Sequence, residues 1–134
     1  LGGYETLRRE VKYGEASRID LLLEDPSKGR CYVEVKNVHL MREAGRAEFP
    51  DCVTMRGAKH LRELGLMAAQ GHRAVMLYLI QRSDADAFSI AGDCDPGYAE
   101  AFKLATEAGV EALAYRCRLT PAEIDVDKAV RIVR

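Results

Sequence analysis

Three residues suited to metal-assisted chemistry lie on two short segments near the N-terminus. Asp20 lies in Ser-Arg-Ile-Asp-Leu-Leu-Leu, and Glu34 and Lys36 lie in Cys-Tyr-Val-Glu-Val-Lys. Two carboxylates held close together repel each other, which favours a shared proton or a bound cation. A divalent ion such as Mg²⁺ or Mn²⁺ takes oxygen ligands and retains water. With a lysine to orient that water, the pattern predicts attack on a phosphate.

Three strands would have to bring these groups together. Residues 7–13 alternate well enough for a strand, residues 17–23 are interpreted as a second strand, and residues 31–40 are rich in β-branched side chains. Residues 24–29 are dense in turn formers. The three segments therefore predict an antiparallel meander.

Side chains alternate across a strand, so each candidate has a predictable side. Glu34 and Lys36 share one side of the third strand, and Asp20 shares a side of the second with Arg18. If these strands are neighbours, a carboxylate from each approaches one point, and Glu10 of the first strand can add another. Asp20 and Glu34 are the predicted metal ligands, and Glu10 is expected to orient a second ion or water.

The rest of the chain alternates helices and strands. Together with the meander this order predicts an α/β domain with a mixed central sheet and helices packed on both faces. The predicted elements are a helix from Thr54 to Gly71, a buried strand at 74–80, a helix from Asp95-Pro96 to Gly109, a strand at 110–119 and an ambiguous tail at 122–134. The apolar stripe of the first helix consists of Met55, Ala58, Leu61, Leu64 and Ala68.

A structural interpretation of the charged residues competes with the chemical one. Glu-x-Lys is common on strands, and an antiparallel sheet with one wet face carries such charges as cross-strand pairs. Adding Asp20 at hairpin distance leaves the two interpretations balanced, and spacing alone does not separate them.

Composition describes one domain of ordinary character. The chain has 134 residues and a formal net charge of −1, whereas a dedicated nucleic-acid binder is more often basic. No apolar run approaches the roughly 20 residues of a membrane helix. The chain starts with neither Met nor a signal peptide, so we expect part of a longer cytoplasmic protein.

The remaining special residues favour structural roles. The four cysteines lack metal-ligand spacing and are expected to be buried free thiols in a reducing compartment. The three histidines are expected to be structural or surface residues, and three large side chains of the second helix are expected in the core. These residues are Cys31, Cys52, Cys94 and Cys117; His39, His60 and His72; and Tyr98, Phe102 and Leu104.

Longer blocks of sequence resemble one bacterial and archaeal family, that of sugar fermentation stimulation protein A. The resemblance runs through nearly the whole chain. It is carried by REVKYGEASRIDLLL at 9–23, CYVEVKNVHL at 31–40, FPDCVTMRGAKHLREL at 49–64, GHRAVMLYLIQR at 71–82 and GVEALAY at 109–115.

This resemblance implies that residues 1–134 form a restriction-endonuclease-like domain of the PD-(D/E)xK type, preceded in the full-length protein by a helix and an OB-like domain. Asp20 then matches the first acidic position, Glu34 the (D/E) position and Lys36 the lysine, with Ile19 where the motif name has Pro. The Val35 carbonyl is implied as a further metal ligand. The family also implies DNA binding with little sequence preference and regulation of sugar, notably maltose, metabolism.

Four further residues are candidates for DNA contact. Arg56 and Lys59 lie near the start of the first helix, where they could meet phosphates or simply form a solvated face. Gln81 follows the buried strand and could lie at the edge of the predicted metal site. Arg18 could contact DNA or pair with the carboxylates when no metal is bound.

Overall fold

The computed structural model describes residues 4–13, 17–50, 52–119 and 124–133. Its elements in chain order are β1 (Thr6–Tyr13), β2 (Ser17–Asp25), β3 (Gly29–Val38), β4 (Leu40–Glu43), β5 (Arg46–Phe49), α1 (Met55–Ala69), β6 (Arg73–Ile80), β7 (Ala87–Ile90), α2 (Pro96–Glu107), β8 (Glu111–Leu119) and β9 (Ile124–Val133).

The strands form one mixed sheet in the order β1-β2-β3-β6-β8-β9-β7-β5-β4. The predicted meander is confirmed, because β1, β2 and β3 pair antiparallel in sequence. The link between β2 and β3 turns at Gly29, whose φ of +80° is in the left-handed region that favours glycine. Strand β6 then pairs parallel with β3 on one side and with β8 on the other. The α/β fold class is therefore confirmed.

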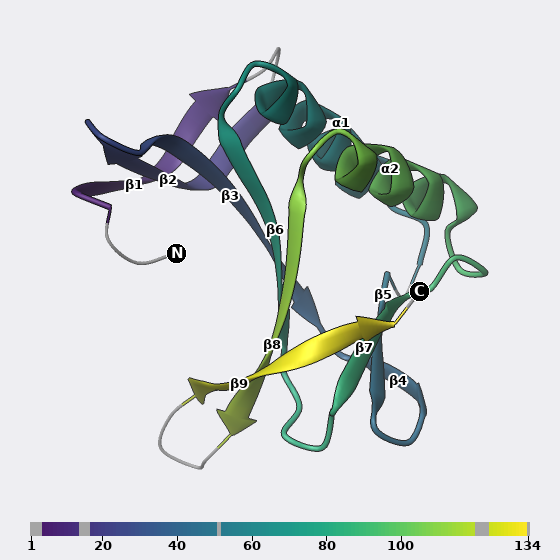
Figure 1. Ribbon diagram of the computed structural model, residues 1–134. Coiled ribbons are helices and arrows are strands. Elements are labelled where there is room, and N and C mark those ends of the chain that lie inside the picture. The colour runs from purple at the N-terminus through teal and green to yellow at the C-terminus, as the bar shows by residue number, and fades with distance from the viewer. Residues whose placement is uncertain (1–3, 14–16, 51, 120–123, 134) are drawn as a thin grey trace.

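The expectation of helices on both faces of the sheet is wrong for the described residues. Helices α1 and α2 lie side by side over the same face (Figure 1), and the side chains of β6 that point toward them, such as Met76 and Tyr78, are fully buried. The chain moves in one direction across the sheet from β3 to β6 to β8. Parallel crossovers have a single hand, so two steps in the same direction put both helices on the same side.

Both predicted helix starts are confirmed. The Thr54 hydroxyl accepts a hydrogen bond from the Gly57 amide at 2.9 Å, and the Asp95 carboxylate accepts one from the Tyr98 amide at 3.1 Å. The Asp95 carboxylate also accepts from the Thr54 amide at 2.7 Å. A Cβ at Gly57 would lie 2.9 Å from the Thr54 side chain, so a larger residue there would displace the side chain that caps the helix. The first turn of α1 is therefore fixed relative to α2.

Several side chains lie elsewhere than predicted. Met55 of the predicted apolar stripe is 83% exposed and Leu104 of the predicted core is 54% exposed, whereas Tyr98 and Phe102 are buried. Cys31 and Cys117 are buried as predicted, whereas Cys94 is half-buried and Cys52 is exposed. Met55 is the first residue of α1, and Leu104 lines the hollow between α1 and α2 instead of packing on the sheet.

Candidate functional site

Strand β3 carries two of the candidate residues toward the helices. Glu34 is paired in register with Met76 of β6, and Lys36 with Tyr78. Tyr32 and Val38, two residues to either side of this pair, belong to the core beneath the helices, while Cys31 and Val33 pack on the opposite face. The predicted alternation is thus correct, and it places a carboxylate and an ammonium under α1. Glu34 is 3% exposed.

Asp20 reaches the same place from β2. The antiparallel pairing of β2 with β3 extends from Asp25 to Leu21, which pairs with Val33, and stops there. Just past that point, the Asp20 carboxylate accepts a hydrogen bond from the Val35 amide at 2.8 Å. The side chain therefore bridges the two strands where their backbone ladder ends, next to Glu34 and Lys36. The structure brings the three candidate side chains to one locality.

His60 of α1 completes the cluster and was missed by the sequence prediction of its function. Its Nδ1 lies 3.0 Å from Lys36 Nζ and 3.2 Å from Glu34 Oε1, and the residue is 5% exposed. The sequence feature that could have indicated a functional role for His60 is its position, four residues before Leu64 and so on the apolar side of the helix. An imidazole there was compatible with a packed core residue, so the pattern alone did not separate the two roles.

The cluster leaves one buried oxygen without a partner. Lys36 Nζ is 3.6 Å from Glu34 Oε1, and Glu34 Oε2 is buried with no hydrogen bond. A buried carboxylate with an open oxygen is costly unless a cation or donor completes it. Asp20, Glu34 and the Val35 carbonyl offer only oxygen, the donor type that Mg²⁺ and Mn²⁺ accept. The donor atoms of these residues therefore suit a divalent cation. Within the described residues, no group of three or more Asp, Glu, His or Cys side chains is positioned to hold a metal ion without a backbone carbonyl or water.

Two buried tyrosines, one on β6 and one on α2, lie close to the cluster. The hydroxyls of Tyr78 and Tyr98 are 2.6 Å apart. Burial raises the pKa of Tyr98, and the nearby charges of Glu34 and Asp95 raise it further. Burial likewise raises the pKa of Tyr78. Both hydroxyls therefore stay neutral at physiological pH and add no charge next to the cluster.

The candidate DNA-contacting residues are only partly placed. Arg56 is exposed, one helical turn before His60. Lys59 Nζ lies 3.8 Å from Glu63 Oε1. The Gln81 amide donates a hydrogen bond to the side-chain oxygen of Asn37 at 3.1 Å, next to Lys36 on β3. Glu10 and Arg18 lie in β1 and β2, but their side chains fall outside the described part of the molecule.

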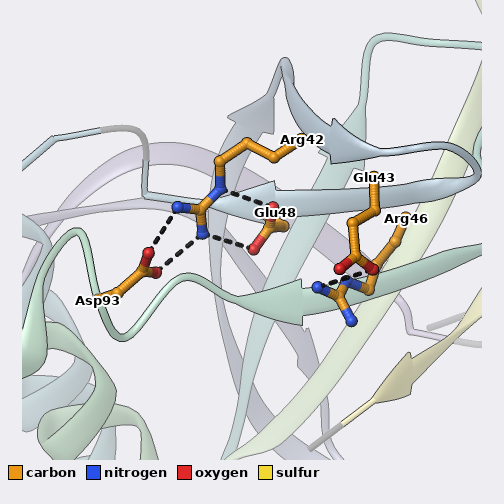
Figure 2. Close-up of polar contacts among 5 residues, drawn as sticks. All are labelled: Arg42, Glu43, Arg46, Glu48 and Asp93. Carbon is orange, nitrogen blue, oxygen red and sulfur yellow. Dashed lines mark hydrogen bonds and ion pairs between the residues drawn. The ribbon is translucent and has the colours of Figure 1, made fainter.

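A second polar cluster lies at the far edge of the sheet (Figure 2). Arg42 of β4 donates to Glu48 of β5 at 2.8 and 2.9 Å and to Asp93 before α2 at 2.6 and 2.8 Å. These bonds lower the pKa of Asp93 to about 2 and lower that of Glu48. The cluster borders a cavity of about 900 Å³. Because Arg42 engages both carboxylates, it ties the β4–β5 hairpin to the loop before α2.

Comparison with known proteins assigns the family. The family model described as "Sugar fermentation stimulation protein RE domain" matches residues 1–123. The chain belongs to the sugar fermentation stimulation protein family. It is 64% identical over 132 residues to the sugar fermentation stimulation protein homolog of Rhodospirillum centenum, covering 98% of this chain and 57% of that protein. It is 63% identical over 124 residues to the homolog of Rhizobium rhizogenes, covering 92% and 50%.

A solved structure supports the fold. The structure described as that of Pyrococcus furiosus SfsA in complex with Ca²⁺ matches with a TM-score of 0.87 and 33% identity, over 97% of this chain and 57% of that chain. The restriction-endonuclease-like fold implied by the sequence resemblance is therefore confirmed. The chain spans about half of the length of the relatives it matches. None of the helices in the described ranges is long and apolar enough to cross a membrane.

Proposed function

We propose that this domain hydrolyses phosphodiester bonds in DNA with the help of Mg²⁺ or Mn²⁺. The observation that carries the proposal is the open, buried Oε2 of Glu34 beside Asp20 and Lys36. Most buried carboxylate oxygens in proteins have a hydrogen-bond partner, so an open oxygen next to a second carboxylate and a lysine favours a bound cation. The Pyrococcus furiosus protein, whose structure is described as a complex with Ca²⁺, supports a divalent cation as a ligand of the fold.

Each residue then has a distinct task. Asp20, Glu34 and the Val35 carbonyl would hold the cation, which when bound supplies charge stabilisation for a phosphate and a lowered pKa for water. The Lys36 ammonium has three hydrogens and no acceptor, so it can orient an attacking water and donate to a phosphate oxygen. Glu10 would orient a second ion or water.

DNA is the proposed substrate, with Arg56, Lys59, Gln81 and Arg18 as its contacts. Basic and amide side chains position the phosphate backbone without reading sequence. The net charge of −1 indicates that this domain alone binds weakly, so we propose that an OB-like domain of the full-length protein supplies further affinity. This assignment places the protein in the cytoplasm, with the DNA.

A second candidate function is a non-enzymatic DNA-binding regulator of sugar metabolism, such as that of maltose, on a nuclease scaffold. The names of the relatives, which refer to stimulation of sugar fermentation, favour it. In that case the carboxylates and Lys36 would serve only the charge balance of the domain.

The deciding experiment measures cleavage of single-stranded, double-stranded and branched DNA by the full-length protein with Mg²⁺, Mn²⁺ or EDTA. Lys36→Met is compared with Lys103→Met, the same change at an exposed position of α2. Metal-dependent cleavage lost only in Lys36→Met supports the phosphodiesterase. Salt-sensitive DNA binding with no cleavage of any substrate would reject it in favour of the regulator. In either case, Arg56→Gln should reduce the slope of log affinity against log salt by about 1.

A further inference from the structure

His60 is placed to contact two charged residues through a single ring atom. Its Nδ1 lies 3.0 Å from the Lys36 ammonium and 3.2 Å from Glu34 Oε1. Its helix is held in place by the Thr54 cap and by the link from Thr54 to Asp95. The ring is therefore fixed from the helix side, while its two partners come from the same strand.

Hydrogen-bond chemistry decides which partner the ring serves. An ammonium group can only donate, so the 3.0 Å contact with Lys36 is a hydrogen bond in the tautomer that carries its hydrogen on Nε2 and leaves Nδ1 as the acceptor. If Nδ1 carried a hydrogen, it would point a donor at another donor. With Nδ1 accepting from Lys36, the ring offers no hydrogen to Glu34 through that atom. Glu34 Oε2 then has no hydrogen bond, and Oε1 has a long 3.6 Å contact with Lys36 and a 3.2 Å contact with a ring nitrogen that supplies no hydrogen.

We propose that His60 is a positioning residue that holds the Lys36 ammonium away from Glu34 and so leaves Glu34 available to a divalent cation. A charge-assisted hydrogen bond between an ammonium and a carboxylate is ordinarily about 2.7–2.9 Å long. The 3.6 Å separation is longer because Lys36 is drawn to His60 instead. This inference rests on the proposed cation site but not on DNA cleavage.

The consequence of losing His60 follows from the competition for Glu34. Without the ring acceptor, Lys36 can close onto the carboxylate and neutralise it. A cation would then have to displace an ammonium before it could bind. Loss of a side chain that orients metal ligands typically costs about 10–100-fold in metal affinity, and we expect His60→Leu to fall in that range.

The test is the affinity of the full-length protein for Ca²⁺ alone, measured by isothermal titration calorimetry. His60→Leu should bind Ca²⁺ about 10–100-fold more weakly than wild type. His60→Asn should stay close to wild type, because the amide oxygen of Asn can accept from Lys36 where Nδ1 does. The matched control is His39→Leu, the same change at an exposed position after β3.

A second pair of variants separates positioning from damage to the fold. If His60 acts by restraining Lys36, then His60→Leu should have no further effect on Ca²⁺ affinity in a Lys36→Met background. A His60→Leu protein that binds Ca²⁺ like wild type, or that loses affinity equally with and without Lys36, would overturn the inference. Wild type that binds no Ca²⁺ would overturn the proposed cation site as well. Wild type that binds Ca²⁺ and follows this pattern without cleaving DNA would uphold the inference while rejecting the phosphodiesterase.

Discussion

Glu34→Gln should stabilise the metal-free protein while removing its ability to be stabilised by metal. Glu34 is 3% exposed and has one oxygen without a hydrogen bond, near a second carboxylate, Asp20. Glutamine has almost the same shape and removes the negative charge. A carboxylate whose burial serves metal binding is a cost to the metal-free fold, so its neutralisation should raise the free energy of unfolding.

The expected magnitude comes from two opposing contributions. An unsatisfied buried acceptor costs about 1–3 kcal/mol, more if it is charged. Neutralisation also loses the attraction between Glu34 and Lys36. That contact is long at 3.6 Å and the ammonium keeps its 3.0 Å contact with His60, so the loss offsets only part of the gain. We therefore expect a net increase of about 1 kcal/mol in EDTA. For a chain of this size, that raises the melting temperature by about 4 °C.

The assay is urea and thermal unfolding followed by circular dichroism, since the chain contains no tryptophan. At a Ca²⁺ concentration 100 times its dissociation constant, wild type should gain about 2.7 kcal/mol. Glu34→Gln should gain far less. Glu43→Gln, an exposed glutamate paired with Arg46, should change stability by less than about 0.5 kcal/mol. A Glu34→Gln protein less stable than wild type in EDTA would refute the reasoning.

Two further predictions concern polar contacts around the site and at the far sheet edge. Tyr98→Phe should lower the free energy of unfolding by about 1–3 kcal/mol because it leaves the buried Tyr78 hydroxyl without its hydrogen-bond partner. In a double-mutant cycle, the double variant Tyr78→Phe/Tyr98→Phe should lose less stability than the sum of the two single variants, and simple additivity would contradict this. Arg42→Met should lower the melting temperature at pH 7 because it leaves the buried Glu48 without its guanidinium. The pKa values of Glu48 and Asp93 are lowered in the fold, so the stabilisation by Arg42 is present above about pH 4 and is lost as pH falls toward 2. Thermal melts of both proteins across that range should therefore converge, and a gap that widens at low pH would count against the assignment.

The elements that position the site were predictable because their signals are local. Alternation along residues 31–40 fixed the side of Glu34 and Lys36, and the turn formers before Gly29 indicated the hairpin that brings Asp20 alongside. The starts at Thr54 and Asp95 followed from side chains that cap a helix within three residues. Each of these features depends on neighbours in the sequence, and the structure reproduces them.

The features that were missed depend on distant partners. No element was predicted where strands β4 and β5, of four residues each, are found. Glu48 of β5 is buried in a cluster with Arg42 and Asp93, which are 51 positions apart. The contact of His60 is with Lys36, 24 positions earlier on a strand. The placement of both helices on one face depends on the order of the strands, which the pattern of residues does not give.

The most direct test of the central claim is anomalous X-ray diffraction from crystals of the full-length protein soaked with Mn²⁺. We expect an anomalous peak bounded by the carboxylates of Asp20 and Glu34 and the Val35 carbonyl, and its loss in Glu34→Gln crystals. A peak only elsewhere in the molecule, or no peak at this position with saturating Mn²⁺, would contradict the claim that these residues form a divalent-cation site.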